Sequence, residues 1–154
     1  MRFKWLSIPV LFAALSAAPL AGGDGDDILG FWFTDGADSK VEIYKCGDTY
    51  CGKIVDLKEK VYPADDERGM AGQTKVNRNH PDPSQQNQPL IGLDIMEGFI
   101  FNGKIWSGGT IYDPKNGKTY KCKAEFAEDG AKLKVRGYIG ISLLGRTTVW
   151  ERAR

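Results

Sequence analysis

Residues 98–139 read GFIFNGKIWSGGTIYDPKNGKTYKCKAEFAEDGAKLKVRGYI, and this stretch decides the fold. It contains four segments rich in apolar and β-branched residues, at about 98–101, 104–112, 118–127 and 131–139. Asn-Gly or Asp-Gly stands between successive segments, at residues 102–103, 116–117 and 129–130. These dipeptides adopt the positive φ angles of tight β-hairpin turns. The stretch therefore predicts four antiparallel strands in a meander.

Side-chain alternation in the third of these segments indicates which face is buried. Tyr120, Cys122, Ala124 and Phe126 share one parity, whereas the intervening residues are Lys, Lys and Glu. Successive residues of a strand point to opposite faces, so the first set is expected to face the core. We therefore interpret Cys122 as a buried free thiol, in preference to an intermolecular bridge or a catalytic nucleophile.

The same strand signals continue outside this stretch. Further segments lie at about 29–34, 40–46, 50–57, 90–96 and 145–152. Strands without helices to cover them must form two packed sheets or close on themselves, and closure removes exposed edges. We expect an all-β, antiparallel, mostly up-and-down barrel of about eight strands, in a single domain over residues 29–154.

One long loop, at about residues 58–89, interrupts the strand rhythm. It contains four prolines, an acidic run and many Asn and Gln residues. A loop of this length inside a compact domain is usually functional or mobile. It also holds the only histidine, His80, between Asn79 and Pro81. We interpret His80 as a surface residue near a turn rather than as a site residue.

The N-terminus reads MRFKWLSIPVLFAALSAAPLAGG over residues 1–23. A basic start, an apolar run about half as long as a membrane-spanning helix, and small residues after it indicate a secretory signal peptide. We expect it over residues 1–21, with cleavage between about 18 and 23; a short N-terminal anchor is the alternative. Residues 22–28 are then expected to be a flexible, solvated lead. The mature protein is predicted to be periplasmic or secreted, without a stable membrane span.

Composition narrows the function classes further. The 154 residues include 21 Lys and Arg, 20 Asp and Glu and one His, with a formal net charge of +1. This balance argues against nucleic acid, which calls for a basic stripe. A single histidine excludes a multi-histidine metal site within one chain. Without residues 1–21, the 19 glycines make up about 14% of the chain, roughly twice the usual share, which favours many tight turns.

Two of the three cysteines are predicted to pair. If Asp48-Thr49 is a two-residue turn, Cys46 and Cys51 lie directly opposite each other, at the short end of disulfide geometry. An oxidising compartment favours this disulfide over two reduced thiols. A zinc site is disfavoured, because the pair has no second ligand pair.

The sequence contains no motif for catalysis or for a cofactor. The segment around Ser142 does not read G-x-S-x-G, and no glycine-rich phosphate loop occurs. Ser107 has only His80 as an imidazole base, and that histidine lies in the proline-rich loop. We therefore predict no catalytic residue, no metal and no cofactor, and rank an enzyme third among the functions.

Two family resemblances bear on the fold. Gly30-Phe31-Trp32 at the first strand, with Arg152 after the last, resembles the lipocalin G-x-W and the late Arg that packs across the Trp. A more specific resemblance, over about residues 29–152, is to the secreted bacterial family called domain of unknown function 2147. Its motifs are VEIYKCG at 41–47, YCGKI at 50–54, PLIGL at 89–93, WSGGTIYDP at 106–114, GKTY at 117–120 and VRGYIGISLLGRT at 135–147, then Trp150.

This resemblance implies a lipocalin-like (calycin) barrel and no settled activity. Gly30, Trp32, Trp150 and Arg152 are then expected to have structural roles. The chain departs from the family pattern at Gln88, where many members carry Arg, so a binding role of that Arg does not carry over to this chain.

Aromatic and arginine side chains are the candidate ligand-binding residues. Eight-stranded barrels of this size can hold one small ligand, and Arg or Tyr can meet its carboxylate or hydroxyl. The candidates are Tyr44, Trp106, Tyr112, Tyr120, Arg136, Tyr138 and Arg146. Arg136 shares parity with Lys134 and Tyr138, so the simpler interpretation is that it faces solvent or braces Tyr138.

The sequence favours a periplasmic or secreted lipocalin-like protein that binds a small apolar or amphipathic ligand. The alternative is an envelope module for protein–protein interaction that uses the 58–89 loop and the apolar connection from Ile139 to Leu144, which would be costly to expose. No motif names a protein partner.

Overall fold

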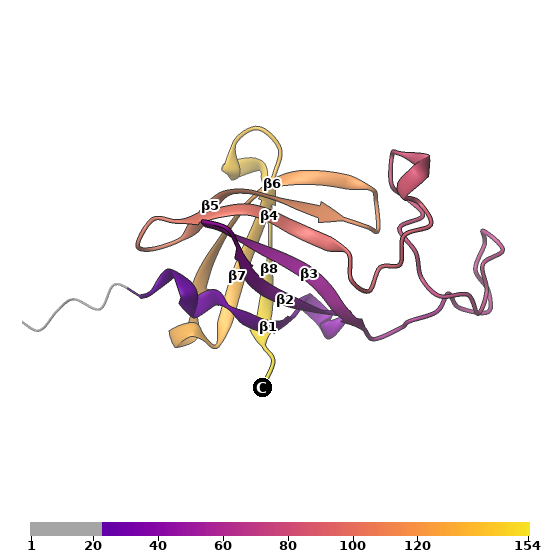
Figure 1. Ribbon diagram of the computed structural model, residues 1–154, viewed down its shortest axis with the longest axis horizontal. Helices are drawn as coiled ribbons and strands as arrows, with labels where there is room; N and C mark the ends of the chain where they lie inside the picture. Colours follow the sequence, from indigo (N-terminus) through magenta and orange to yellow (C-terminus); the bar gives the residue numbers. More distant parts are fainter. Residues whose placement is uncertain (1–22) are drawn as a thin grey trace, which may run out of the picture.

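The computed structural model describes residues 23–154, so the predicted signal peptide lies outside the described residues. The chain forms a closed barrel of eight antiparallel strands in up-and-down order, which confirms the predicted fold class (Figure 1). The strands are β1 (Gly30–Phe33), β2 (Ser39–Cys46), β3 (Thr49–Leu57), β4 (Asp94–Phe101), β5 (Trp106–Asp113), β6 (Lys118–Ala127), β7 (Lys132–Tyr138) and β8 (Arg146–Arg152). Short 3₁₀ turns are η1 (Gly25–Ile28), η2 (Asp35–Ala37), η3 (Pro83–Gln85), η4 (Glu128–Gly130) and η5 (Ser142–Leu144).

The predicted segments at 90–96 and 98–101 contribute to a single strand, β4. Gly98 has a φ of +72°, but pairing continues on both sides of it, and opposite β3 one extra residue of β4 stands between the Gly52–Met96 and Tyr50–Phe99 pairs. The extra residue forms a bulge rather than a turn, so the strand continues. This is why the barrel has eight strands and not nine.

Side chains fill the centre of the barrel. Trp32, Phe99 and Trp106 are at most 1% exposed. Gly109 makes room for them, because a Cβ at this position would overlap the Phe99 ring. Cys122 lies in the same core as a buried free thiol, as predicted, and burial raises its pKa to about 12.

The turn η1 closes one end of the barrel. The Nε1 of Trp32 donates to the carbonyl of Ile28 at 2.9 Å, and the Nε1 of Trp106 donates to the carbonyl of Gly25 at 3.0 Å. Ile28 is itself buried in the core. The prediction of a solvated lead over 22–28 is therefore wrong for η1, because two buried indoles need its carbonyls as acceptors.

Arg152 occupies the position that the lipocalin resemblance implies. Its guanidinium lies 4.2 Å from the centroid of the Trp32 ring and donates to the carbonyls of Leu29, Asp27 and Gly130. The strand β1 begins at Gly30 with a φ of +111°, a conformation that favours glycine. These contacts tie the two ends of the chain together across the closing pair β1–β8.

The Cys46–Cys51 disulfide is present, with 5.9 Å between the two Cα atoms. The predicted turn was wrong by one residue: the turn is Gly47-Asp48, and Cys46 pairs with Thr49. Gly47 takes a φ of +65° and Asp48 does not have a positive φ, which is the pattern of a type II′ turn with Gly at its first central position. The two cysteines are thus diagonal neighbours on one face of the hairpin rather than direct partners.

Across the described residues, no helix is both long and apolar enough to span a membrane.

Candidate functional site

The seven predicted ligand-binding residues lie in separate parts of the barrel. Trp106 belongs to the packed core at the η1 end, where its N–H is already used. Tyr120 lies near the opposite end, half-buried beside Ile111, and its hydroxyl accepts from Asn116 at 2.9 Å. Arg146 is exposed at the start of β8, opposite Gly137. These three residues do not share a cavity in the described structure.

Tyr44 and Tyr112 lie on the outer wall. The Tyr44 hydroxyl donates to Asp94 at 2.7 Å, and this hydrogen bond is the main cause that raises the pKa of Tyr44 to about 12. The Tyr112 hydroxyl donates to Asn77 of the long loop at 2.5 Å. Desolvation raises the pKa of Tyr112, so this phenol remains a hydrogen-bond donor near neutral pH.

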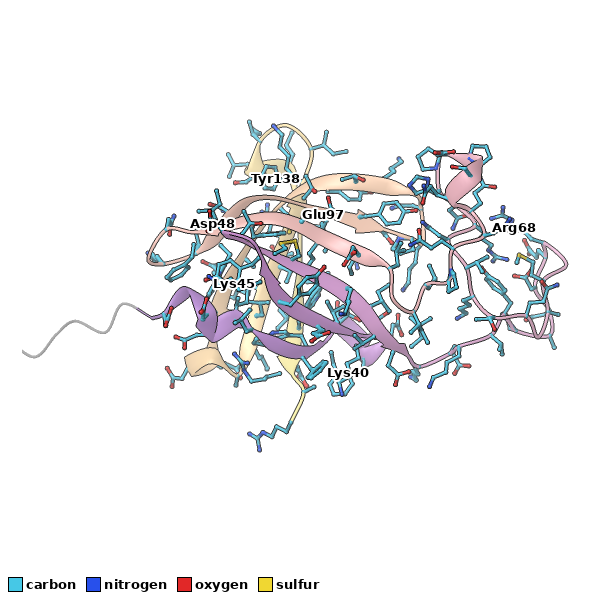
Figure 2. The ribbon with its side chains drawn as sticks, viewed as in Figure 1. Lys40, Lys45, Asp48, Arg68, Glu97 and Tyr138 are labelled. Carbon is cyan, nitrogen blue, oxygen red and sulfur yellow. A yellow bond between two sulfur atoms is a disulfide. The ribbon has the colours of Figure 1, made fainter. Side chains whose placement is uncertain are left out.

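A polar hollow of about 210 Å³ lies between the long loop and this wall. His80 forms one side and packs on Tyr112, with 5.5 Å between ring centroids. Glu97 and Asp94 come from β4, and Figure 2 shows Glu97 on this strand. The hollow is lined by Asn77, His80, Gln85, Gln88, Leu93, Asp94, Ile95, Glu97, Thr110, Tyr112 and Thr119.

The long loop is held by its own contacts. The Tyr62 hydroxyl accepts from the N–H of Val76 at 3.1 Å and donates to its carbonyl at 3.0 Å. The Arg78 guanidinium stacks 3.9 Å from the centroid of the Tyr62 ring and donates to Asp66 at 2.8 Å. The pKa of Asp66 is lowered, first by the N–H of Met70 and then by Arg78. The loop therefore has its own small core and a partly buried ion pair.

Asn79 anchors the loop to the barrel. Its Nδ2 donates to the carbonyls of Pro114 and Lys115 at 2.9 and 3.1 Å, in the β5–β6 turn. Gly117 in the same turn permits this approach, because a Cβ there would overlap the carbonyl of Asn79. The polar hollow is thus bounded by a fixed wall.

Arg136 holds the connection between β7 and β8. Its Nε donates to the carbonyl of Ser142 at 2.6 Å, and its other nitrogens donate to the carbonyl of Leu143 at 3.2 Å and to Thr147 Oγ1 at 2.8 Å. Gly145 packs closely on β7, since a Cβ there would lie 2.5 Å from the carbonyl of Gly137. The connection therefore folds back over the outer wall of the barrel.

Tyr138 lies at the base of this connection (Figure 2). It pairs with Lys121 across the sheet and is half-buried. A Cβ at Gly145 would come within 2.8 Å of the Tyr138 Cβ, so the returning chain packs directly on this residue. Arg136 and Tyr138 are the two predicted ligand residues that the structure places beside the same connection.

A larger hollow of about 410 Å³ lies under the returning connection, and we call it the basic groove. It is lined by Ile105, Lys123, Ala124, Glu125, Lys134, Arg136, Ser142, Leu143 and Thr147. Three of these residues are cations and one is an acid, while Ile105 and Leu143 are apolar. Within residues 23–154, no ion pair involves any of the three cations.

Sequence reasoning singled out Arg136 but missed its partners in the groove. Lys123 and Arg136 are direct neighbours on β6 and β7, and Glu125 faces Lys134. The signal was present in the alternation of both strands, which puts these residues on the outer face. The pairing of β6 with β7 brings Lys123 and Lys134 to one surface. The η5 turn folds over this surface, and the groove lies between the two.

Comparisons with known proteins agree with this architecture. The search of curated proteins found no match. A solved structure described as protein HP1028 from the human pathogen Helicobacter pylori, a member of the lipocalin family, matches with a TM-score of 0.61 and 21% identity. The match covers 75% of this chain and 73% of that chain, and at this identity it shows the shared fold. The family model for uncharacterized protein conserved in bacteria (DUF2147) matches residues 30–152, and the chain therefore belongs to this family.

Proposed function

We propose that this chain is an extracytoplasmic, lipocalin-like binding protein that takes a small amphipathic anion in its basic groove. The observation that carries the proposal is the combination of a 410 Å³ hollow, the apolar side chains of Ile105 and Leu143, and three cations that take part in none of the ion pairs among residues 23–154. Ligand sites in proteins typically combine apolar lining with a few placed polar groups.

Arg136 is suited to bind the anionic head group. A guanidinium has five N–H donors, and three of its hydrogen bonds here fix it to Ser142, Leu143 and Thr147. Two N–H groups remain for a carboxylate or phosphate oxygen, on a side chain that is already held in place. Lys123 and Lys134 add positive charge on either side of it in the same lining.

The apolar part of the ligand fits the remaining lining. Ile105 and Leu143 offer apolar surface next to the cations. The barrel centre is a less suitable place, because Trp32, Phe99 and Trp106 fill it and η1 closes its end. The proposed ligand therefore lies on the outer wall, beside the β7–β8 connection.

The disulfide and the N-terminal sequence support a location outside the cytoplasm. Disulfides persist in oxidising compartments such as the periplasm, and the chain has the Cys46–Cys51 bond. Residues 1–21 have the pattern of a signal peptide. We propose a periplasmic or secreted protein on these two grounds.

The test is a titration of the mature protein with a fluorescent fatty-acid analogue and, separately, with its methyl ester. We expect saturable binding of the acid and binding of the ester that is weaker by roughly tenfold or more, since the ester lacks the charge that Arg136 would meet. The double variant Lys123→Glu/Lys134→Glu should weaken acid binding to a similar extent.

The matched control is Lys58→Glu/Lys104→Glu, which makes the same change in net charge at two exposed lysines outside the groove. It should bind the acid like the parent protein. Equal binding of acid and ester, or equal losses in the two double variants, would overturn the proposed function.

A further inference from the structure

The connection between β7 and β8 exposes four large apolar side chains, which we call the apolar tip: Ile139, Ile141, Leu143 and Leu144. Their exposed fractions are 68%, 60%, 83% and 79%. Every other exposed large apolar side chain in the described part of the chain is less exposed than these four. Isolated apolar residues on a surface are ordinary, whereas a contiguous exposed group marks a contact surface.

The apolar tip has a defined shape. The N–H of Leu144 donates to the carbonyl of Ile141 at 3.2 Å, and the N–H of Gly145 donates to the carbonyl of Ser142 at 3.3 Å. The three hydrogen bonds from Arg136 hold the same turn against β7 and β8. The chain therefore keeps these four side chains turned outward instead of folding them onto the barrel.

Positive charge surrounds the apolar tip. Arg146 follows it after Gly145, and Lys121, Lys123 and Lys134 lie on the adjacent outer face of β6 and β7. All six ion pairs found in residues 23–154 use other side chains. Within the lining of the basic groove, Glu125 is the only carboxylate.

We propose that the apolar tip docks the protein onto an anionic lipid bilayer, with its side chains in the interface and the surrounding cations on the headgroups. Apolar side chains that enter the headgroup boundary next to basic residues bind anionic membranes by burial and by charge together. The proposal names a source for the amphipathic anion and to that extent rests on the proposed function.

A bilayer fits this surface better than a folded protein does. Figure 1 shows the connection as a projecting loop at the top of the barrel, away from the long loop. A stable protein interface buries about 800 Å² on each partner, which four side chains on a projecting turn do not supply. Insertion into lipid needs no complementary pocket, so a small convex apolar tip is sufficient.

The first test is co-flotation of the mature protein with vesicles, in the absence of any added ligand. We expect binding to phosphatidylcholine vesicles that contain phosphatidylglycerol, roughly tenfold weaker binding to pure phosphatidylcholine, and loss of binding in high salt. Ile139→Ser/Leu144→Ser should reduce binding by about tenfold or more. Neither residue lines the basic groove, so this variant should keep its binding of the fluorescent acid.

The control is Ile91→Ser/Ile100→Ser, which removes two exposed isoleucines elsewhere on the barrel and should float like the parent. A second measurement uses Ile141→Trp, whose emission should be quenched by brominated acyl chains.

Failure of the parent to float, or equal losses in both serine variants, overturns the docking proposal. Reproducible crosslinks from the tip to one envelope protein, without flotation, also overturn it in favour of a protein partner. Loss of acid binding with intact flotation overturns the proposed function alone.

Discussion

The two longest connections between strands of this barrel place their side chains in opposite ways. The 58–89 loop buries Tyr62, pairs Arg78 with Asp66 and fastens itself to the barrel through Asn79. The 139–145 connection is much shorter, yet it holds the four most exposed large apolar side chains in the described chain. Figure 1 shows them on different sides of the molecule.

This contrast indicates which of the two connections contacts an external partner. The long loop is the candidate that its length favours, because long loops are often functional, but Tyr62, Arg78 and Asp66 form its own small core. The 139–145 connection has its backbone satisfied and its apolar side chains turned outward, a state that only an external partner improves.

Tyr62→Ala should have the largest effect on stability. It removes a buried ring, two hydrogen bonds to Val76 and the surface on which Arg78 stacks. We expect a loss of about 3 kcal/mol in the free energy of unfolding of the region, with faster amide exchange at Val76 and Asn77. Urea unfolding and hydrogen exchange measure the two effects. A loss below about 0.5 kcal/mol would mean that the long loop has no core of its own.

Arg136→Ala should have an intermediate effect on the short connection. It removes two hydrogen bonds to the turn, at the carbonyls of Ser142 and Leu143, and one to Thr147 of β8, each of which contributes modestly at a surface. We expect a loss of about 1–2 kcal/mol and faster amide exchange at Leu144 and Gly145, with no change in the long loop. Two-dimensional NMR exchange experiments resolve the connections separately. Equal changes in amide exchange in the 58–89 loop and in the 139–145 connection would contradict the expectation that the two connections are stabilised independently.

Acid should distinguish the two connections by charge. The folded pKa of Asp66 lies below its ordinary value of 3.8, so its contribution to stability is complete well above pH 3.8 and is lost as the pH falls through the folded pKa. Residues 139–145 contain no titratable side chain. Between pH 6 and pH 3, the protection of amides from exchange, taken relative to the intrinsic rate at each pH, should therefore fall more in the long loop than in the apolar tip. Asp66→Asn should remove most of that difference, and an unchanged profile in this variant would contradict the assignment.

Leu144→Ser should have the smallest effect on stability. The side chain is 79% exposed, so its removal is expected to change the free energy of unfolding by less than about 0.5 kcal/mol. Thermal unfolding of the variant beside Tyr62→Ala gives the sharpest contrast between the connections. A large loss in the free energy of unfolding would show that Leu144 packs inside the protein. It would contradict the description of the apolar tip as an exposed surface.

Much of the fold was predictable because it depends on local patterns. Alternation placed Cys122 inside, and Asn-Gly and Asp-Gly marked hairpin ends. The register of the first hairpin was harder, since Gly47-Asp48 and Asp48-Thr49 are both plausible turns and only the positive φ of Gly47 decides between them. The η1 turn was missed because its role depends on two backbone carbonyls that accept hydrogen bonds from the indoles of Trp32 and Trp106. No local sequence pattern encodes these contacts.

The candidate site was predictable only in part, for the same reason. Parity placed Arg136 outside, and composition made the Ile139–Leu144 segment conspicuous. The basic groove arises only when Lys123 comes beside Arg136 through strand pairing and η5 folds over both. Such a site depends on contacts between strands and a returning turn, so a list of aromatic residues scattered across the barrel could not locate it.

The most direct test is a ¹⁵N NMR titration of the mature protein with dodecanoate below its micelle concentration. The proposed binding in the basic groove predicts saturable shift changes at Lys123, Lys134 and Arg136 and through the adjoining turn, with residues of the polar hollow unaffected. Changes centred on Trp106 and Cys122 in the barrel core, changes centred on Gln88 and Tyr112, or no saturable change at all would contradict it.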